Sequence, residues 1–402
     1  MGEALAAFSW PPGVALRRHA AQPVDGVPVA ATLAPETPEA VAAALSALAE
    51  AGLAALPRGA GTQLGLGNPP ARADAFLSLE KLAEVIELDA AEGVCRVGAG
   101  ARLEALRSRV SEAGWELPLD DAGRGGTVGG ALATAALAPR AAGFGRPRDV
   151  VLGLEVALPD GRLTHCGGRV VKNVTGYDLA KLYLGSLGTL GVITSAWLRL
   201  RPRPEVREVL RGGALPDAEA CEHAVVWSRV PALRSLLLRD TGHGLEPWLE
   251  LAGDAASVSG AREELGRAGL ERAGAAEREA IAARRFAAPE GSCRFAVSCL
   301  PSRLAACVAE LRAAGAALML LPASSLVIAR FEADASEVAF RVVGRAARAG
   351  GGRQLCEAAP PACKAGRDVF AAPAEEVALT RQLKAQFDPR GILAPGRFAG
   401  GV

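Results

Sequence analysis

The sequence has almost no excess charge, and this shortage excludes two classes of partner. Its 402 residues include 45 Lys and Arg against 44 Asp and Glu, so the formal net charge is +1. Proteins that hold nucleic acid or an acidic membrane surface usually do so through a strong positive field. The sequence therefore predicts no nucleic-acid partner and no direct binding to lipid.

Metal-binding and redox motifs are also missing. The eight cysteines contain no C-x-x-C pair, and the six residues between Cys356 and Cys363 match no common iron–sulfur spacing. No two of the four histidines lie within four residues of each other, so there is no H-x-H or H-x-x-H pair. We expect reduced thiols and no metal site. The catalytic residues cannot be assigned from the sequence.

Long hydrophobic runs are absent as well. The longest strongly apolar stretch, residues 313–321, ends at Pro322 and is far shorter than the roughly 20 residues that span a bilayer. The first residues carry neither the basic start nor the apolar run of a secretory signal. We expect a cytoplasmic protein without a membrane span, and any association with a membrane would go through partner proteins.

What the sequence does contain is an ordinary globular composition, long enough for two or three domains. Thr37, Pro38 and Gly52 bound a predicted helix, and residues 53–56 then form a short strand that leads into a glycine loop. A second helix is expected over 103–113, a helix start at 131–137, a hairpin over 150–166 and a strand over 192–200. The boundary at Pro202 and Pro204 separates residues 20–205 from a second domain at 206–370.

The second domain alternates strand-like and helix-like segments. Strands at 248–251, 295–300 and 320–331 each precede a predicted helix. This order favours an antiparallel sheet covered by helices, and hence an α+β fold class. The last segment, 371–402, is rich in turn residues and is expected to return to the first domain.

Three glycine-rich loops between residues 57 and 191 carry the functional signal. Each lies beside a strand or a helix start and offers backbone N–H groups that no side chain obstructs. Together they favour a dinucleotide ligand over three unrelated turns. The loop does not follow the Rossmann pattern, because Leu64 stands where G-x-G-x-x-G requires its third glycine, and no P-loop motif is present.

These loops resemble the FAD-binding PCMH-type domain of the vanillyl-alcohol oxidase superfamily. Residues 172–179 (Lys-Asn-Val-Thr-Gly-Tyr-Asp-Leu) are similar to a motif of its glycolate oxidase and D-lactate dehydrogenase branch, as are 387–389 and 395–397 near the C-terminus. The remaining motifs are 57–62 (Pro-Arg-Gly-Ala-Gly-Thr), 127–130 (Thr-Val-Gly-Gly), 148–153 (Arg-Asp-Val-Val-Leu-Gly), 159–161 (Pro-Asp-Gly) and 185–194 (Gly-Ser-Leu-Gly-Thr-Leu-Gly-Val-Ile-Thr).

The resemblance implies an FAD domain of two α/β subdomains, followed by a cap-like antiparallel sheet with helices. It also implies that the first loop wraps the FAD diphosphate, that the second contacts the phosphates and flavin side, and that the third lies along the ADP part. The implied cofactor residues are Arg58, Gly59, Ala60, Gly61, Thr62, Gln63, Thr127, Val128, Gly129, Gly130, Arg148, Asp149, Gly188, Gly191, Val192 and Ile193.

Three features depart from the family pattern. Asp121-Ala122 stands where many relatives have a proline pair, and Ala394 occupies a place often taken by asparagine near the flavin. The first loop has no histidine or cysteine, so FAD is expected to be noncovalent. The histidine-rich segment that catalytic members of the branch use for metal and 2-hydroxy acid is missing.

This combination is similar to the smaller, FAD-binding E subunit of glycolate oxidase. The resemblance implies a complex with a larger flavin dehydrogenase subunit and an iron–sulfur subunit, oxidising glycolate to glyoxylate. Two alternatives stay open. One is a self-sufficient FAD oxidoreductase for D-lactate or another 2-hydroxy acid, with Lys172 and Tyr177 as candidate catalytic groups, although both have structural explanations. The other is an assembly protein that has lost flavin.

Overall fold

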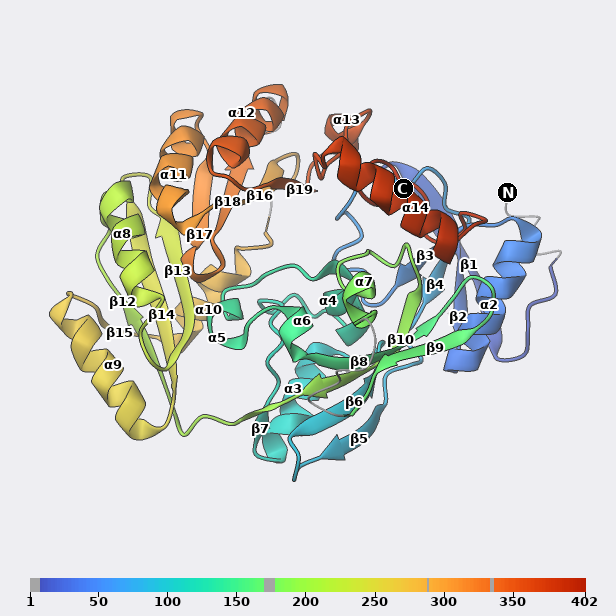
Figure 1. Cartoon of the computed structure of the whole chain (residues 1–402), viewed down its shortest axis with the longest axis horizontal. Helices are drawn as coiled ribbons and strands as arrows, with labels where there is room; N and C mark the ends of the chain where they lie inside the picture. The colour runs from blue at the N-terminus through green and yellow to red at the C-terminus, as the bar shows by residue number, and fades with distance from the viewer. Residues whose placement is uncertain (1–7, 170–177, 288, 333–335) are drawn as a thin grey trace.

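The computed structural model describes residues 8–169, 178–287, 289–332 and 336–402. Its strands form sheets of four, five and eight strands and one two-stranded pair. Figure 1 shows the four- and five-stranded sheets together in one half of the molecule and the eight-stranded sheet in the other. No helix in these described ranges has the length and apolar character needed to cross a bilayer.

The four-stranded sheet carries the first glycine loop at the end of one strand. The strand order is β1 (Val14–Val24), β2 (Val27–Pro35), β4 (Ala75–Ser78) and β3 (Ala55–Arg58). Helix α2 (Pro38–Ala51) forms as expected, because the Thr37 hydroxyl accepts the Ala40 N–H and Gly52 closes the helix with φ +66°. β3 begins two residues later than the predicted strand and ends at Arg58, where the loop starts.

The five-stranded sheet is antiparallel throughout. Its order is β5 (Val85–Asp89), β6 (Val94–Gly98), β10 (Val192–Arg199), β8 (Val151–Ala157) and β9 (Leu163–Gly167). The β8–β9 hairpin confirms the turn prediction at 159–161. This sheet and the four-stranded sheet share one hydrophobic core, which includes Leu33, Leu77 and Val97.

Short helices connect these two sheets. They are α3 (Leu103–Glu112), α4 (Val128–Thr134), α5 (Ala141–Phe144), α6 (Pro147–Val150) and α7 (Ala180–Tyr183). The predicted start of α4 at residue 131 is wrong: the helix begins at Val128, because Thr127 is its N-cap and accepts the Gly130 N–H at 3.2 Å. It ends at Thr134, since Ala135 adopts a left-handed conformation with φ +46°.

The eight-stranded sheet confirms the predicted antiparallel arrangement. Helices cover its outer face (Figure 1), namely α8 (Asp217–Trp227), α9 (Ala255–Arg267), α11 (Leu304–Ala313) and α12 (Ser336–Ala349). The strand order is β15 (Glu271–Ala273), β12 (Val206–Arg211), β14 (Leu245–Gly253), β13 (Leu233–Asp240), β17 (Ala317–Leu321), β18 (Leu326–Phe331), β16 (Cys293–Ser298) and β19 (Gln354–Ala358).

The single strand expected over 320–331 is two strands. A short 3-10 helix, η2 (Pro322–Ser324), separates β17 from β18, and Ser325 follows it with φ +50°. A second 3-10 turn, η1 (Pro301–Arg303), precedes α11. On the opposite face of the sheet, α10 (Ala275–Ala283) and α5 lie between the sheet and the N-terminal half.

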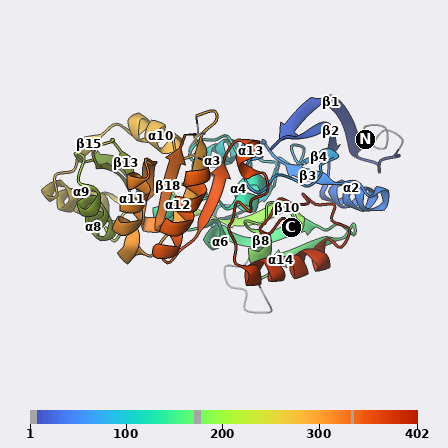
Figure 2. The same cartoon turned by 90° about the horizontal axis from the view of Figure 1, so that it is seen from above.

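The last part of the chain packs on the N-terminal sheets. Ala55 donates its N–H to Ile392 and accepts from the Ala394 N–H, at 2.8 and 2.9 Å, so residues 392–394 lie beside β3. Figure 2 shows α14 (Ala374–Phe387) in the half of the molecule that holds these sheets. The remaining short elements are β7 (Trp115–Glu116), which pairs with β11 (Arg201–Pro202), and α13 (Pro361–Lys364).

Candidate functional site

A cavity of about 980 Å³ lies where the three glycine loops meet. This volume includes space that is open to solvent. Thirteen of the sixteen predicted cofactor residues line it: Arg58, Gly59, Ala60, Gly61, Thr62, Gln63, Thr127, Gly129, Gly130, Gly188, Gly191, Val192 and Ile193. The sequence motifs, which are up to 135 positions apart, thus converge on one space.

The first loop, residues 59–64, has unused donors. Among the residues that the structure describes, no protein group accepts the backbone N–H of any of these six positions. Gly61, with φ +76°, gives the loop a turn that L side chains disfavour. The Arg58 side chain points elsewhere: it donates to Gln22 at 2.8 Å and stacks on Phe76. For a diphosphate, the loop therefore offers main-chain N–H donors and not a side-chain cation.

The carbonyl side of the following residues is held by two buried cations. Arg397 donates to the carbonyl oxygens of Leu64 and Leu66, and Lys364 donates to that of Gly65 at 2.5 Å. Both cations also donate to Asp25, at 2.8 and 2.9 Å, and both are nearly inaccessible to solvent. A network of this kind fixes the loop, because its buried charges are satisfied only while the loop carbonyls and Asp25 keep these positions.

The second loop contributes differently from the expectation. The N–H groups of Val128 and Gly129 already donate to Ala101 and Ala99, and that of Gly130 donates to Thr127. These three amides are therefore not free for phosphate. Gly129 is needed for packing, since a Cβ there would lie 2.7 Å from the Ala99 Cβ. Val128 is fully buried and does not line the cavity.

The third loop closes the cavity on the other side. A Cβ at Gly191 would lie 2.6 Å from a Val156 methyl group, so only glycine permits this approach to β8. Lys384 of α14 donates to the Thr189 carbonyl at 2.7 Å and to buried Asp388 at the same distance. The C-terminal segment thus holds two of the three loops.

Arg148 and Asp149 do not line the cavity. They lie in α6, where the Asp149 carboxylate accepts the Arg146 N–H at 2.8 Å and caps the one-turn helix. The polar groups of this motif therefore stabilise α6. Lys172 and Tyr177, the candidate catalytic groups, lie outside the described residues.

None of the four histidines is among the residues that line the cavity. His19 contacts Thr32, and His165 contacts Glu155 at 3.0 Å. His223 packs edge-on against Trp227. None of these three, nor His243, lines the cavity.

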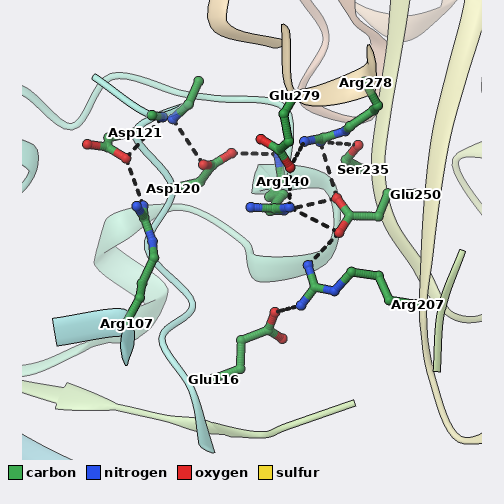
Figure 3. Close-up of polar contacts among 12 residues, drawn as sticks. Arg107, Glu116, Asp120, Asp121, Arg140, Arg207, Ser235, Glu250, Arg278 and Glu279 are labelled. Atoms are coloured by element: carbon green, nitrogen blue, oxygen red, sulfur yellow. Dashed lines mark hydrogen bonds and ion pairs between the residues drawn. The ribbon is translucent and has the colours of Figure 1, made fainter. Parts of the chain in front are cut away.

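An ion-pair network joins the segment before α5 to the eight-stranded sheet (Figure 3). Glu250 of β14 forms ion pairs with three arginines, Arg140, Arg207 and Arg278, and is almost fully buried. Burial by itself raises the pKa of Glu250, but attraction by Arg278 and Arg140 outweighs it and leaves the pKa below its usual value. The carboxylate is therefore ionised in the folded protein.

The same network reaches the second loop. The Arg140 N–H donates to Asp120 at 3.0 Å, and the neighbouring Asp121 pairs with Arg107 at 2.8 Å and accepts the Gly126 N–H (Figure 3). Sequence reasoning did not predict the contacts of Arg140 with Glu250 and Asp120, because these residues are 110 and 20 positions apart. They set the position of the eight-stranded sheet relative to the cavity.

Comparison with known proteins agrees with this geometry. Residues 29–167 match the model of an FAD binding domain, and residues 371–398 match that of the C-terminal domain of FAD linked oxidases. Among solved structures, p-cresol methylhydroxylase superposes with a TM-score of 0.72 at 15% identity, over 92% of this chain and 89% of that one. Alkyldihydroxyacetonephosphate synthase gives 0.68 at 14% identity, over 98% and 84%. These two likenesses show the α+β fold.

Curated relatives match over part of their length. D-lactate dehydrogenase of Archaeoglobus fulgidus is 38% identical over 49% of this chain and 45% of that protein. Mitochondrial D-2-hydroxyglutarate dehydrogenase of Bos taurus is 39% identical over 47% and 35%. Glycolate oxidase subunit GlcD of Bacillus subtilis is 32% identical over 45% and 38%. The aligned part thus spans less than half of each of these relatives.

The cavity fits the group that the family model names. Six main-chain N–H groups at residues 59–64 have no acceptor among the described residues and could bind a diphosphate, and glycines line the cavity where a Cβ would meet the wall. Residues 29–167 therefore match an FAD binding domain, residues 371–398 match the C-terminal domain of FAD linked oxidases, and FAD is the cofactor of this chain.

Proposed function

We propose that this chain is the FAD-binding component of an enzyme that oxidises a 2-hydroxy acid to the 2-oxo acid. The observation that carries the proposal is the set of backbone N–H groups at 59–64 that have no acceptor among the described residues, in a loop that lines the cavity. Support for the substrate class comes from the named relatives, because lactate, 2-hydroxyglutarate and glycolate are all 2-hydroxy acids.

When bound, FAD supplies the acceptor for the two electrons that leave the hydroxyl-bearing carbon. The work of the chain is binding and orientation. The amides of 59–64 hold the diphosphate, and Lys364 and Arg397 hold that loop from behind. The Glu250 network joins the eight-stranded sheet to the segment before α5.

In the finer form of the proposal, the chain works in a complex with a larger flavin dehydrogenase subunit and an iron–sulfur subunit, and the substrate is glycolate. Two observations favour it. No histidine of this chain lines the cavity, so the base for substrate oxidation is left for a partner to supply. One of the relatives is itself named as a subunit of glycolate oxidase.

The alternative is a self-sufficient oxidoreductase for D-lactate or a related acid. It is favoured by the match to D-lactate dehydrogenase and by arginines in a second cavity beside the first, described below. In that case the base would come from a residue other than histidine.

The decisive experiment is to purify the chain, record its visible spectrum and measure dye reduction with glycolate and D-lactate. The assay is run with and without the candidate partner subunits. Flavin absorbance with activity only on adding partners is the expected result. Activity of the chain alone selects the self-sufficient enzyme. A colourless protein that takes up no added FAD would overturn both forms of the proposal.

A further inference from the structure

A second cavity, of about 1170 Å³, adjoins the first between the 121–124 segment and the eight-stranded sheet. Thr62, Gln63, Leu66 and Arg124 line both cavities, so the two spaces share a wall. The far side of the second cavity is formed by Phe286, Arg294 and Glu357. A molecule in it would lie next to the FAD cavity.

Three arginines surround the Phe286 ring. The guanidinium carbons of Arg124, Arg285 and Arg294 lie 3.5, 4.5 and 6.0 Å from the ring centre. Arg124 comes from the N-terminal half of the chain, and the other two come from the second half. The ring thus gathers positive charge from both sides of the interface.

The charges of this cluster do not balance. Glu357 accepts from both terminal nitrogens of Arg285, at 2.5 and 2.6 Å, and from Arg294 Nε at 3.2 Å. One buried carboxylate therefore serves two arginines. Asp121, the other nearby acid, forms its ion pair with Arg107. No carboxylate in the described part of the chain pairs with Arg124.

Arg124 is half-buried, with its terminal nitrogens available. Its Nε donates to the Asp121 carbonyl at 3.0 Å, which fixes the guanidinium plane against Phe286. Its Nη1 and Nη2 atoms meet no acceptor among the described residues, and neither is among the fully enclosed polar atoms. Burial lowers the pKa of Arg124 to about 10, which leaves it charged at neutral pH.

A planar fork of two free N–H donors in a partly dry, positively charged pocket matches a carboxylate group. We propose that Arg124 is the residue that binds the carboxylate of the substrate, in the second cavity. This proposal depends on the proposed function, because it places the acid beside the FAD cavity. The proposal also means that the positive charge that binds the carboxylate comes from the segment that leads into the second glycine loop.

The test measures oxalate binding to the purified full chain by isothermal titration calorimetry, with FAD content measured separately from absorbance. Oxalate is a carboxylate that cannot be oxidised as a 2-hydroxy acid. Arg124→Gln is expected to weaken oxalate binding about 10- to 100-fold, the loss of a charge-assisted pair of hydrogen bonds. Arg124→Lys keeps the charge but lacks the planar pair of N–H donors. Its affinity for oxalate should lie between those of the unchanged chain and Arg124→Gln. FAD content should stay unchanged.

A matched control is Arg211→Gln. Arg211 also lies over an aromatic ring, that of Trp248, but its side chain is exposed, pairs with Glu277 and lines neither cavity. It should bind oxalate as the unchanged chain does.

Three results would overturn the inference: no oxalate binding by the unchanged chain, equal affinity in Arg124→Gln, or loss of FAD from both Arg124 variants, which would assign Arg124 to the cofactor diphosphate. Failure of the proposed function looks different, because the unchanged chain would then take up no FAD while oxalate binding still depended on Arg124.

Discussion

Gly59 lies against Thr127 so closely that a Cβ on the glycine would be 2.1 Å from the threonine hydroxyl oxygen. The same hydroxyl accepts the Gly130 N–H and caps α4. One side chain therefore sets both the start of α4 and the approach of the first loop. No other residue at position 59 permits this contact without a shift of one of the two segments.

Gly59→Ala should weaken FAD binding while leaving the fold intact. The added methyl group pushes the amide loop away from α4, an overpacking cost of about 1–3 kcal/mol, or roughly 10- to 100-fold in affinity when the bound state bears it. Fluorescence titration with FAD measures the effect. Gly65→Ala is the matched control, because a Cβ there meets nothing within 4 Å. Equal affinity of both variants would show that the contact is not needed.

Lys364→Met should destabilise the protein and loosen the first loop. The change leaves Asp25 with one cation and the Gly65 carbonyl without its donor, inside a fully buried network. Breaking a buried ion pair costs about 3–5 kcal/mol. Urea unfolding with and without FAD measures the loss. Arg381→Met, at an exposed arginine of α14, should change the unfolding free energy by less than about 0.5 kcal/mol.

Glu250→Gln should lower stability and flatten its dependence on acid pH. The folded-state pKa of Glu250 lies below the usual value of 4.5. Its ionised form therefore stabilises the fold above about pH 4.5, and that contribution is lost as the pH falls through the lower, folded-state pKa. Unfolding free energies measured between pH 3 and 7 should fall less steeply for the variant. Glu263→Gln, on the exposed face of α9, should keep the steep acid limb.

Ala394 offers a test of backbone conformation at the cavity wall. It lines the cavity and has φ +42°, a region that asparagine tolerates and β-branched residues avoid. Ala394→Asn should fold normally and shift the flavin absorbance maxima, whereas Ala394→Val should lose about 1–3 kcal/mol of stability. Thermal unfolding and visible spectra give both readouts. A stable valine variant would contradict the assignment of strain.

FAD should leave the protein on denaturation. No cysteine or histidine is among the residues that line the cavity, so no thiol or imidazole is placed there for a covalent flavin link. Acid precipitation followed by absorbance of the supernatant tests this. Yellow colour retained in the protein pellet would mean a covalent bond.

Local signals were enough to predict α2, the β8–β9 hairpin and the three glycine loops. Thr37 and Gly52 mark the ends of their helix through contacts within a few residues, and the turn at 159–161 sets its hairpin in the same way. The loops themselves carry their glycines in the sequence. Packing of the sheets and helices brings the loops together. As a result, 13 of the 16 predicted residues line one cavity.

Long-range pairs were beyond sequence reasoning. Arg397 and Lys364 read as ordinary charged residues, and only the fold brings them to the carbonyls of Leu64 and Gly65. The same holds for Arg124 and Phe286, which come from different halves of the chain. Arg148 and Asp149 lie in a capped one-turn helix and do not line the cavity, so their contact with FAD stays a prediction.

The two cations that hold the first loop, Lys364 and Arg397, also impose an order on the steps of folding during synthesis. Lys364 is translated 299 residues after Gly65, whose carbonyl it holds. When only the glycine loops have been synthesised, the first loop still lacks the two cations that hold its carbonyl groups. Lys364 and Arg397 can therefore hold the first loop only after nearly all of this sequence has been synthesised.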